Sequence, residues 1–176
     1  DMMIQNAFNQ FDYDKALDEM KDRLYYDSTN VNYLRQIGEL YEIRYNNFKE
    51  ALSYYQKALR YAYEHNDTDV VTKAACHNHL GDVHNTLCEY DSAEEHYSQA
   101  FTLLEALKDQ SLESLYDSYL GLALVNHSQA DFGEALRYYK RCVSDVVKDA
   151  NAKAYWQGKI GIAHLKWLKG DYQGAK

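Results

Sequence analysis

Two short phrases alternate along the whole chain, and this alternation constrains the fold more than any other feature of the sequence. The first phrase is centred on alanine and places an aromatic residue three positions earlier, as in Tyr13/Ala16 and Tyr90/Ala93. Its alanines, at positions 16, 51, 93, 135 and 175, are 35, 42, 42 and 40 residues apart. The second phrase is centred on glycines at positions 38, 81, 121 and 161, which are 43, 40 and 40 residues apart. Two phrases that alternate at one period indicate a repeat built from two elements.

Both elements have the pattern of a helix. Apolar residues recur at intervals of three and four between residues 48 and 63 and again between 112 and 125, which predicts a one-sided apolar stripe. The chain contains no proline, so its helices are free of the residue that breaks them most strongly. The loop-like breaks that are long enough to notice are "YDSTN" at 26–30, "HNDTD" at 65–69 and "KDAN" at 148–151.

Local signals agree with helix pairs that pack closely. Ser92 followed by Glu95 is a capping-box pattern, which predicts a helix start at Ser92. Glycine or alanine where two antiparallel helices cross lets their backbones approach each other. One such pair cannot bury its apolar face alone, so pairs stack. The sequence therefore predicts an all-α fold, an α-solenoid that forms a single domain over residues 1–176.

The phrases "LGDVHNTLCEYDSAEEHYSQA" and "IGELYEIRYNNFKEALSYYQKAL" resemble the tetratricopeptide repeat, in which a Leu-Gly pair in helix A precedes an aromatic-x-x-Ala entry to helix B. Periods of 40 to 42 residues are similar to those of a longer-period subtype found in kinesin light chains, Pins-type scaffolds and bacterial peptide-receptor and sensor proteins. The resemblance implies a right-handed superhelix. We expect the chain to be part of a larger protein, with repeats at 1–29, 30–66, 67–109, 110–149 and, incomplete, 150–176.

In the family that the chain resembles, the second, fifth, ninth and twelfth positions of helix A line a concave groove. Carried over to this sequence, these positions are Asn32, Arg35, Glu39 and Glu42 in the second repeat, and Ala75, Asn78, Asp82 and Asn85 in the third. With glycine as the anchor, the later repeats contribute Leu115, Ser118, Leu122 and Val125, then Tyr155, Gly158, Ile162 and Leu165. The distance from glycine to the next alanine is two residues longer in those repeats, so Ala123 and Ala163 are alternative anchors.

The resemblance implies a non-enzymatic scaffold that binds a protein or peptide segment. We expect the side-chain amides of Asn78 and Asn85 to hold a peptide backbone. The acidic residues Glu39, Glu42 and Asp82 favour a partner segment that contains Lys or Arg. They have the wrong charge for the lysine-rich clamp with which some members of the family bind a C-terminal carboxylate. The alternative is a sensory or regulatory module of a bacterial signalling protein, which would bind a peptide and control an output domain outside this chain.

The stretch from residue 76 to 97 is rich in histidine and cysteine. His77, His84 and Cys88 lie at i, i+7 and i+11, so they share one helical face and would suit a soft metal. The repeat register offers a different interpretation, in which both histidines pack between helices and Cys88 occupies the turn. We favour packing, because the close ligand pairs of zinc sites are missing from the sequence. Accordingly we expect no metal, no cofactor and no catalytic residue.

Charge and cysteine content limit the possible partners and setting. The chain has 19 basic and 27 acidic residues, a net charge of -8, which argues against binding to the phosphate backbone of a nucleic acid. No apolar run approaches the length of about 18 residues that spans a membrane. Three cysteines without a CxxC pair fit a reduced, cytoplasmic setting. The sequence leaves the oligomeric state open.

Overall fold

The computed structural model describes residues 2–10, 12–65, 68–107 and 112–170 of the chain. Within these residues the chain forms ten helices, which follow one another in this order: α1 (Met2–Asn9), α2 (Tyr13–Tyr26), α3 (Val31–Ile43), α4 (Phe48–Glu64), α5 (Val70–Thr86), α6 (Tyr90–Glu105), α7 (Leu112–Ser128), α8 (Phe132–Arg141), α9 (Asp145–Ala150) and α10 (Ala152–Leu168). The expected helix B of the fifth repeat, from residue 172, lies outside the described residues.

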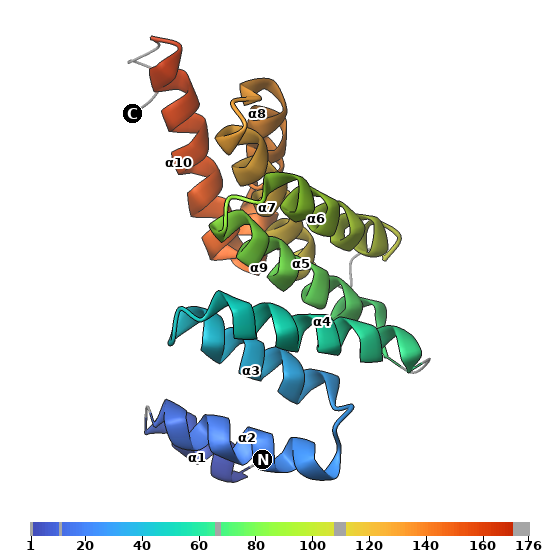
Figure 1. Ribbon diagram of the computed structural model, residues 1–176. Coiled ribbons are helices and arrows are strands. Elements are labelled where there is room, and N and C mark those ends of the chain that lie inside the picture. The colour runs from blue at the N-terminus through green and yellow to red at the C-terminus, as the bar shows by residue number, and fades with distance from the viewer. Residues whose placement is uncertain (1, 11, 66–67, 108–111, 171–176) are drawn as a thin grey trace.

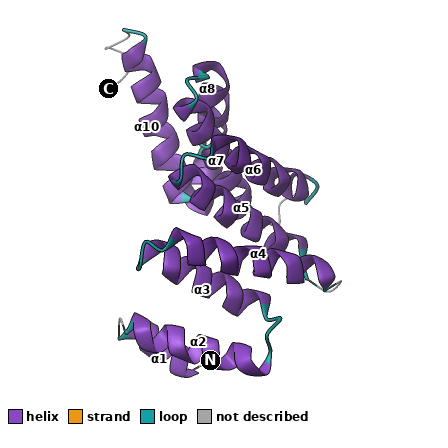
Figure 2. Ribbon diagram, in the orientation of Figure 1, coloured by secondary structure: helices purple, strands orange, loops and turns teal. Residues whose placement is uncertain are grey.

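The helices form antiparallel pairs that stack into a right-handed α-solenoid (Figure 1). We call α1, α3, α5, α7 and α10 the A helices and α2, α4, α6 and α8 the B helices. Each B helix packs against the A helix before it and the A helix after it. Every described element is a helix (Figure 2), as the sequence predicts. None of these helices has both the length and the apolar character that a membrane span requires.

Three turns between an A helix and its B helix have the same backbone geometry. Asn46, Cys88 and Ala130 stand at equivalent positions 42 residues apart, and their φ angles are 48°, 61° and 63°. This left-handed conformation closes the end of the A helix and reverses the chain. Cys88 therefore occupies the turn position that the repeat register assigns to it.

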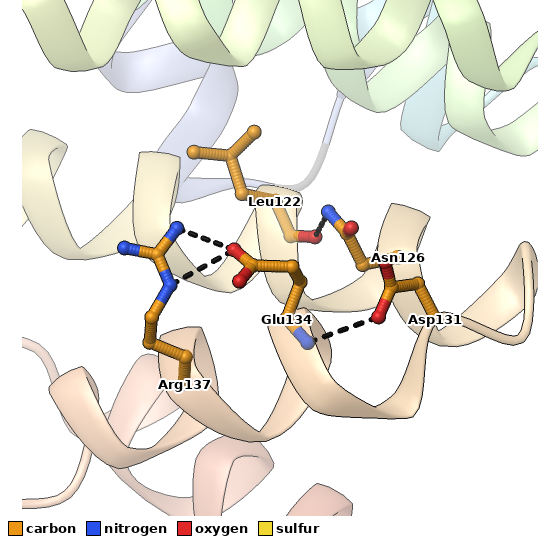
Figure 3. A network of polar contacts seen from close by, with 5 residues as sticks. All are labelled: Leu122, Asn126, Asp131, Glu134 and Arg137. Atoms are coloured by element: carbon orange, nitrogen blue, oxygen red, sulfur yellow. Dashed lines mark hydrogen bonds and ion pairs between the residues drawn. The ribbon is translucent and has the colours of Figure 1, made fainter.

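The turn between α7 and α8 shows how polar contacts fix the chain reversal (Figure 3). The amide of Asn126 donates to the carbonyl of Leu122 over 2.8 Å, and the Asn126 carbonyl accepts the N–H of Asp131 over 2.8 Å. The Asp131 carboxylate then caps α8 by accepting the N–H of Glu134 over 3.1 Å. Arg137 donates through Nε to the Glu134 carboxylate over 2.8 Å. A cap and an ion pair thus start the B helix within one turn of the reversal.

The start of α6 differs from the prediction. Ser92 lies inside the helix, which begins at Tyr90, and the residue at the cap position is Glu89. Glu89 makes no side-chain cap hydrogen bond, and its N–H donates to the carbonyl of His84 over 2.9 Å. The capping-box interpretation was wrong because backbone hydrogen bonds close this turn before Ser92 is reached.

The end of the fourth repeat also differs from the prediction. Residues 148–150 of the expected "KDAN" break belong to α9, and the chain leaves its helical path earlier, between Arg141 and Ser144. The Ser144 hydroxyl caps the new helix by accepting the N–H of Val147 over 3.4 Å. Gly158 of α10 packs against this break, since a Cβ there would lie 2.9 Å from Cβ of Cys142. The break thus accommodates the close approach of α10.

Buried tyrosines of the B helices fill the space that the glycines leave. The ring of Tyr97 on α6 is fully buried, and a Cβ added to Gly81 of α5 would lie 2.7 Å from it. A Cβ added to Gly121 of α7 would meet the same ring. In the next repeat, Tyr139 on α8 is pressed against Gly161 of α10 in the same way. Tyrosine on one helix and glycine on its neighbours are therefore complementary in shape.

Candidate functional site

A cavity of about 390 Å³ lies between four A helices, α3, α5, α7 and α10. Four of the lining residues are groove positions that the register predicts: Arg35, Ala75, Asn78 and Asp82. The rest of the lining consists of Val71, Thr72, His79, Glu113, Ser114, Asp117 and Lys153. Because A helices alone supply this lining, the cavity lies on the face that the register assigns to the groove.

Asn78 uses its side-chain amide to join α5 to α7. Its Nδ2 donates to the carbonyl of Ser114 over 2.9 Å, and its Oδ1 accepts the hydroxyl of Ser118 over 2.8 Å. Ser118, which the register assigns to the groove, is fully buried and is not exposed there. Asn151 makes a related link, since its Nδ2 donates to the carbonyl of Glu113 over 3.0 Å. The position of α7 at the cavity therefore depends on two asparagines, of which the groove register includes one.

The carboxylates at and beside the cavity are held by hydroxyl and amide donors. Tyr97 donates to Oδ1 of Asp82 over 2.6 Å, and Asn151 donates to Oδ1 of Asp117 over 2.9 Å. Glu42, at the end of α3, accepts the hydroxyl of Tyr55 over 2.8 Å. Each carboxylate thus keeps one oxygen in a fixed place and has acceptor capacity left over.

Burial disfavours the charged form of these carboxylates. Desolvation raises the pKa of Glu42 to about 7, although the hydrogen bond from Tyr55 opposes this shift. Desolvation also raises the pKa of Asp82 and of Asp117. The nearby charge of Lys153 lowers the pKa of all three carboxylates and so acts against burial.

The cavity also has two basic groups, Arg35 on α3 and Lys153 on α10. Nη1 of Arg35 lies 3.3 Å from Nε2 of His79, and because a guanidinium can only donate, this histidine nitrogen accepts. His79 is neutral in this arrangement, and desolvation, with Arg35 nearby, lowers its pKa to about 4. Its ring stacks on Tyr55 at a centroid distance of 4.9 Å. The guanidinium is therefore held by a histidine that is itself fixed.

The other predicted groove residues lie apart from this cavity. Asn32 borders a separate hollow at the start of α3, and Glu39 borders another beside Arg44. Asn85 lies in the last turn of α5, where its carbonyl accepts the N–H of Cys88. Of the groove positions predicted in the second and third repeats, Arg35, Ala75, Asn78 and Asp82 are therefore the ones that line the cavity.

The glycine-anchored register is wrong for the fourth and fifth repeats. It assigns groove positions to residues that the structure buries, namely Ser118, Leu122, Val125, Gly158 and Leu165. The glycines there press against the tyrosine of the preceding B helix, so they lie in the interface between successive repeats. Anchoring on Ala123 and Ala163 instead selects Asp117, which lines the cavity, and Ile160 and Trp167, which are exposed, but it also selects the buried Leu120. This second anchor is the signal that could have found Asp117.

The histidine-rich stretch packs between α5 and α6. Nδ1 of His77 lies 3.1 Å from Nδ1 of His96, and the ring of His96 stacks on His84 at 5.4 Å. Burial lowers the pKa of His77 to about 4 and raises that of Cys76 to about 11. Within the described parts of the chain, no three His, Cys, Asp or Glu side chains are grouped to hold a metal ion. Here the histidines make ring contacts with one another.

Comparison with known proteins identifies repeats in the middle of the chain. Residues 72–144 match the family model described as tetratricopeptide repeat. This region includes α7 and nearly all of α5, two of the helices that line the cavity. No curated protein sequence matches the chain.

Solved structures share the fold over nearly the whole chain. The structure of BtubC (BKLC) from P. vanneervenii superposes with a TM-score of 0.78 at 18% identity, covering 98% of this chain and 72% of that one. MamA superposes with a TM-score of 0.70 at 19% identity, covering 98% and 88%. YrrB, described as a TPR protein with an unusual peptide-binding site, gives 0.60 at 18% identity, covering 98% and 77%. Identities this low establish similarity of fold.

Proposed function

We propose that the chain, whose residues 72–144 match the tetratricopeptide-repeat family model, is a non-enzymatic scaffold that binds a peptide segment of a partner protein across the cavity. The fold supports a role in protein–protein interaction, because stacked helix pairs present an extended surface. The observation that carries the proposal is that four successive A helices contribute side chains to one cavity. A segment lying across them would contact each helix in turn.

The charge of the cavity supports a partner segment that contains Lys or Arg. Asp82 and Asp117 line the cavity, and Glu42 on α3 lies close enough to Asp82 for their charges to interact. In the part of the chain that the structure describes, the ion pairs within 4.0 Å lie elsewhere, at Arg60–Glu64, His84–Glu89 and Arg137–Glu134. A cationic side chain in the cavity would therefore gain partners that are not already paired.

The placement of the cysteines supports the non-enzymatic part of the proposal. Burial raises the pKa of Cys142 to about 12 and that of Cys76 to about 11, so both favour the unreactive thiol. Cys88 is exposed, but it lies in the turn after α5 and away from the cavity lining.

The lengths of α4, α5, α6 and α7, between 16 and 17 residues, support the longer-period subtype.

The proposal is tested with a partner captured by the full-length protein and then bound in purified form. The cavity variant Asp82→Asn/Asp117→Asn is compared with Asp91→Asn/Glu105→Gln, which removes two negative charges from the exposed side of α6. We expect the cavity variant to bind about tenfold more weakly, with a smaller dependence on salt. Equal affinities and equal salt dependence of the two variants would show that the partner binds elsewhere.

A further inference from the structure

The cavity has a fixed order of charge along the solenoid. Arg35 comes from α3, Asp82 from α5, Glu113 and Asp117 from α7, and Lys153 from α10. These helices are successive A helices, so their order in the chain is also their order along the groove. Basic groups therefore stand on the two outer helices and acidic groups on the two inner ones.

We propose that Arg35 and Lys153 are specificity-determining residues, which make the cavity select segments with central Lys or Arg residues flanked on both sides by an acidic residue. This inference rests on the proposed function, because it requires a peptide in the cavity. It adds that the acidic cavity discriminates against segments with the opposite order of charge, even when their composition is the same.

On the α3 side, Arg35 is presented in a defined orientation. One of its N–H groups is directed at Nε2 of His79, 3.3 Å away, and the His79 ring is stacked on Tyr55 with an interplanar angle of 6°. A guanidinium has five N–H donors, so others remain for a ligand carboxylate. Planar guanidinium groups pair with carboxylates in a two-pronged geometry, which favours an acidic residue at this end.

On the α10 side, Lys153 supplies a second positive charge near the acidic groups of the cavity. It lies in the first turn of α10, is exposed, and in the described part of the chain makes no ion pair within 4.0 Å. Its charge nevertheless lowers the pKa of Asp82 and Asp117, so its ammonium group shares their electrostatic environment. A ligand cation that binds beside Asp82 and Asp117 would be repelled by the like charge of Lys153. An acidic residue on the α10 side of the ligand removes that repulsion.

Helix spacing gives the expected length of the motif. Packed helices lie about 8–10 Å apart, and an extended chain advances about 3.3 Å per residue, so a bound segment covers about three residues per A helix. Three steps lead from Arg35 on α3 to Lys153 on α10. The two acidic residues are therefore expected about nine residues apart, with the basic residues between them.

The test uses two fluorescent peptides of about twelve residues with a Ser/Gly/Thr background and charges at three-residue intervals. One has the order Glu, Arg, Arg, Glu, and the other has the order Arg, Glu, Glu, Arg. Both have the same composition and the same net charge, so the overall negative charge of the protein acts on them equally. Fluorescence anisotropy is expected to show binding of the first peptide that is about tenfold tighter.

Two variants of equal charge connect this preference to the cavity. We expect Arg35→Gln/Lys153→Gln to reduce the preference to about twofold or less, while Lys140→Gln/Lys166→Gln, on exposed positions outside the cavity, retains it. Equal binding of both peptides by the wild type would contradict the proposed specificity for charge order, and so would a preference that survives in the cavity variant. Neither result would contradict peptide binding in the cavity. If neither peptide binds up to millimolar concentration while the partner still depends on Asp82 and Asp117, the charge order is wrong. If the partner does not depend on them either, both proposals fail.

Discussion

The hydroxyl of Tyr97 on α6 lies 2.6 Å from the carboxylate of Asp82 on α5 and donates to it. One buried side chain therefore packs the third helix pair and also orients an acidic group in the cavity. Any change at Tyr97 is expected to affect both stability and binding.

Replacing this tyrosine with phenylalanine tests the hydrogen bond separately from the ring. We expect Tyr97→Phe to lower the free energy of unfolding by about 1–3 kcal/mol at pH 8, because a buried carboxylate loses its donor. The loss should be smaller at pH 5, since burial raises the pKa of Asp82 and a protonated carboxyl needs that donor less. Urea denaturation at both pH values measures the difference. The control Tyr26→Phe, on an exposed tyrosine, should change stability at neither pH.

Close contact between helices predicts different effects for two glycine substitutions. A Cβ at Gly121 would collide with the ring of Tyr97, whereas a Cβ at Gly133 would lie 3.5 Å from Asp131. We expect Gly121→Ala to destabilise the protein by about 1–3 kcal/mol despite the better helix propensity of alanine. Gly133→Ala should be neutral or stabilise it by up to about 1 kcal/mol. Thermal unfolding of both variants distinguishes these outcomes, and equal melting temperatures would contradict them.

Burial of Glu42 makes stability depend on pH. Its pKa in the folded protein is raised to about 7 from 4.5, mainly by desolvation, with Asp82 and Glu39 adding repulsion and Tyr55 and Lys153 opposing it. Because the folded state holds the proton more tightly, this group lowers stability as pH rises from about 4.5 to 7. We therefore expect Glu42→Gln to stabilise the protein by about 1–3 kcal/mol at pH 8 and to have little effect at pH 4.5.

Chemical denaturation across this range provides the measurement for Glu42→Gln. The matched control is Glu105→Gln, which removes one negative charge from an exposed position at the end of α6. A stabilisation of the control equal to that of Glu42→Gln would assign the effect to net charge instead of burial.

The left-handed turn between α7 and α8 predicts a stabilising substitution. Ala130 has a φ of 63°, a conformation that an L-residue with a Cβ adopts at a cost of about 1–2 kcal/mol and glycine adopts freely. We expect Ala130→Gly to raise the free energy of unfolding by about 0.5–1 kcal/mol after the entropy of the unfolded chain is counted. Ala106→Gly, at an exposed position with a φ of -73°, should lower it. Melting temperatures that move in the same direction would contradict the prediction.

The sequence predicted the helix pairs because the spacing of small and aromatic residues is a direct record of packing. The expected helices at 48–63 and 112–125 correspond to α4, Phe48–Glu64, and α7, Leu112–Ser128. Spacing does not record which neighbour a small residue faces. Gly81 and Gly121 both contact Tyr97, although Tyr97 belongs to the repeat of Gly81 and precedes that of Gly121. The glycine anchor therefore fails to locate the groove in the repeats whose glycine faces the tyrosine of the preceding B helix.

The site was harder to predict than the fold because side chains from distant repeats meet there. The third-repeat positions Asn78 and Asp82 line the cavity, and so does Arg35 from the second. Lys153 was missed because it lies in the first turn of α10, ahead of the groove positions considered, and reaches the cavity from a different repeat. The sequence of a single repeat does not indicate a contact between side chains of different repeats.

The position of Tyr97 between Gly81 and Gly121 also determines how the molecule comes apart. Linear repeat proteins often unravel from their ends, one unit at a time. A ring shared by α5 and α7 must lose both contacts together, so the third and fourth helix pairs should open as one cooperative unit. Amide hydrogens of α5, α6 and α7 would then exchange with a common free energy, and the middle of the solenoid would be its slowest segment to open.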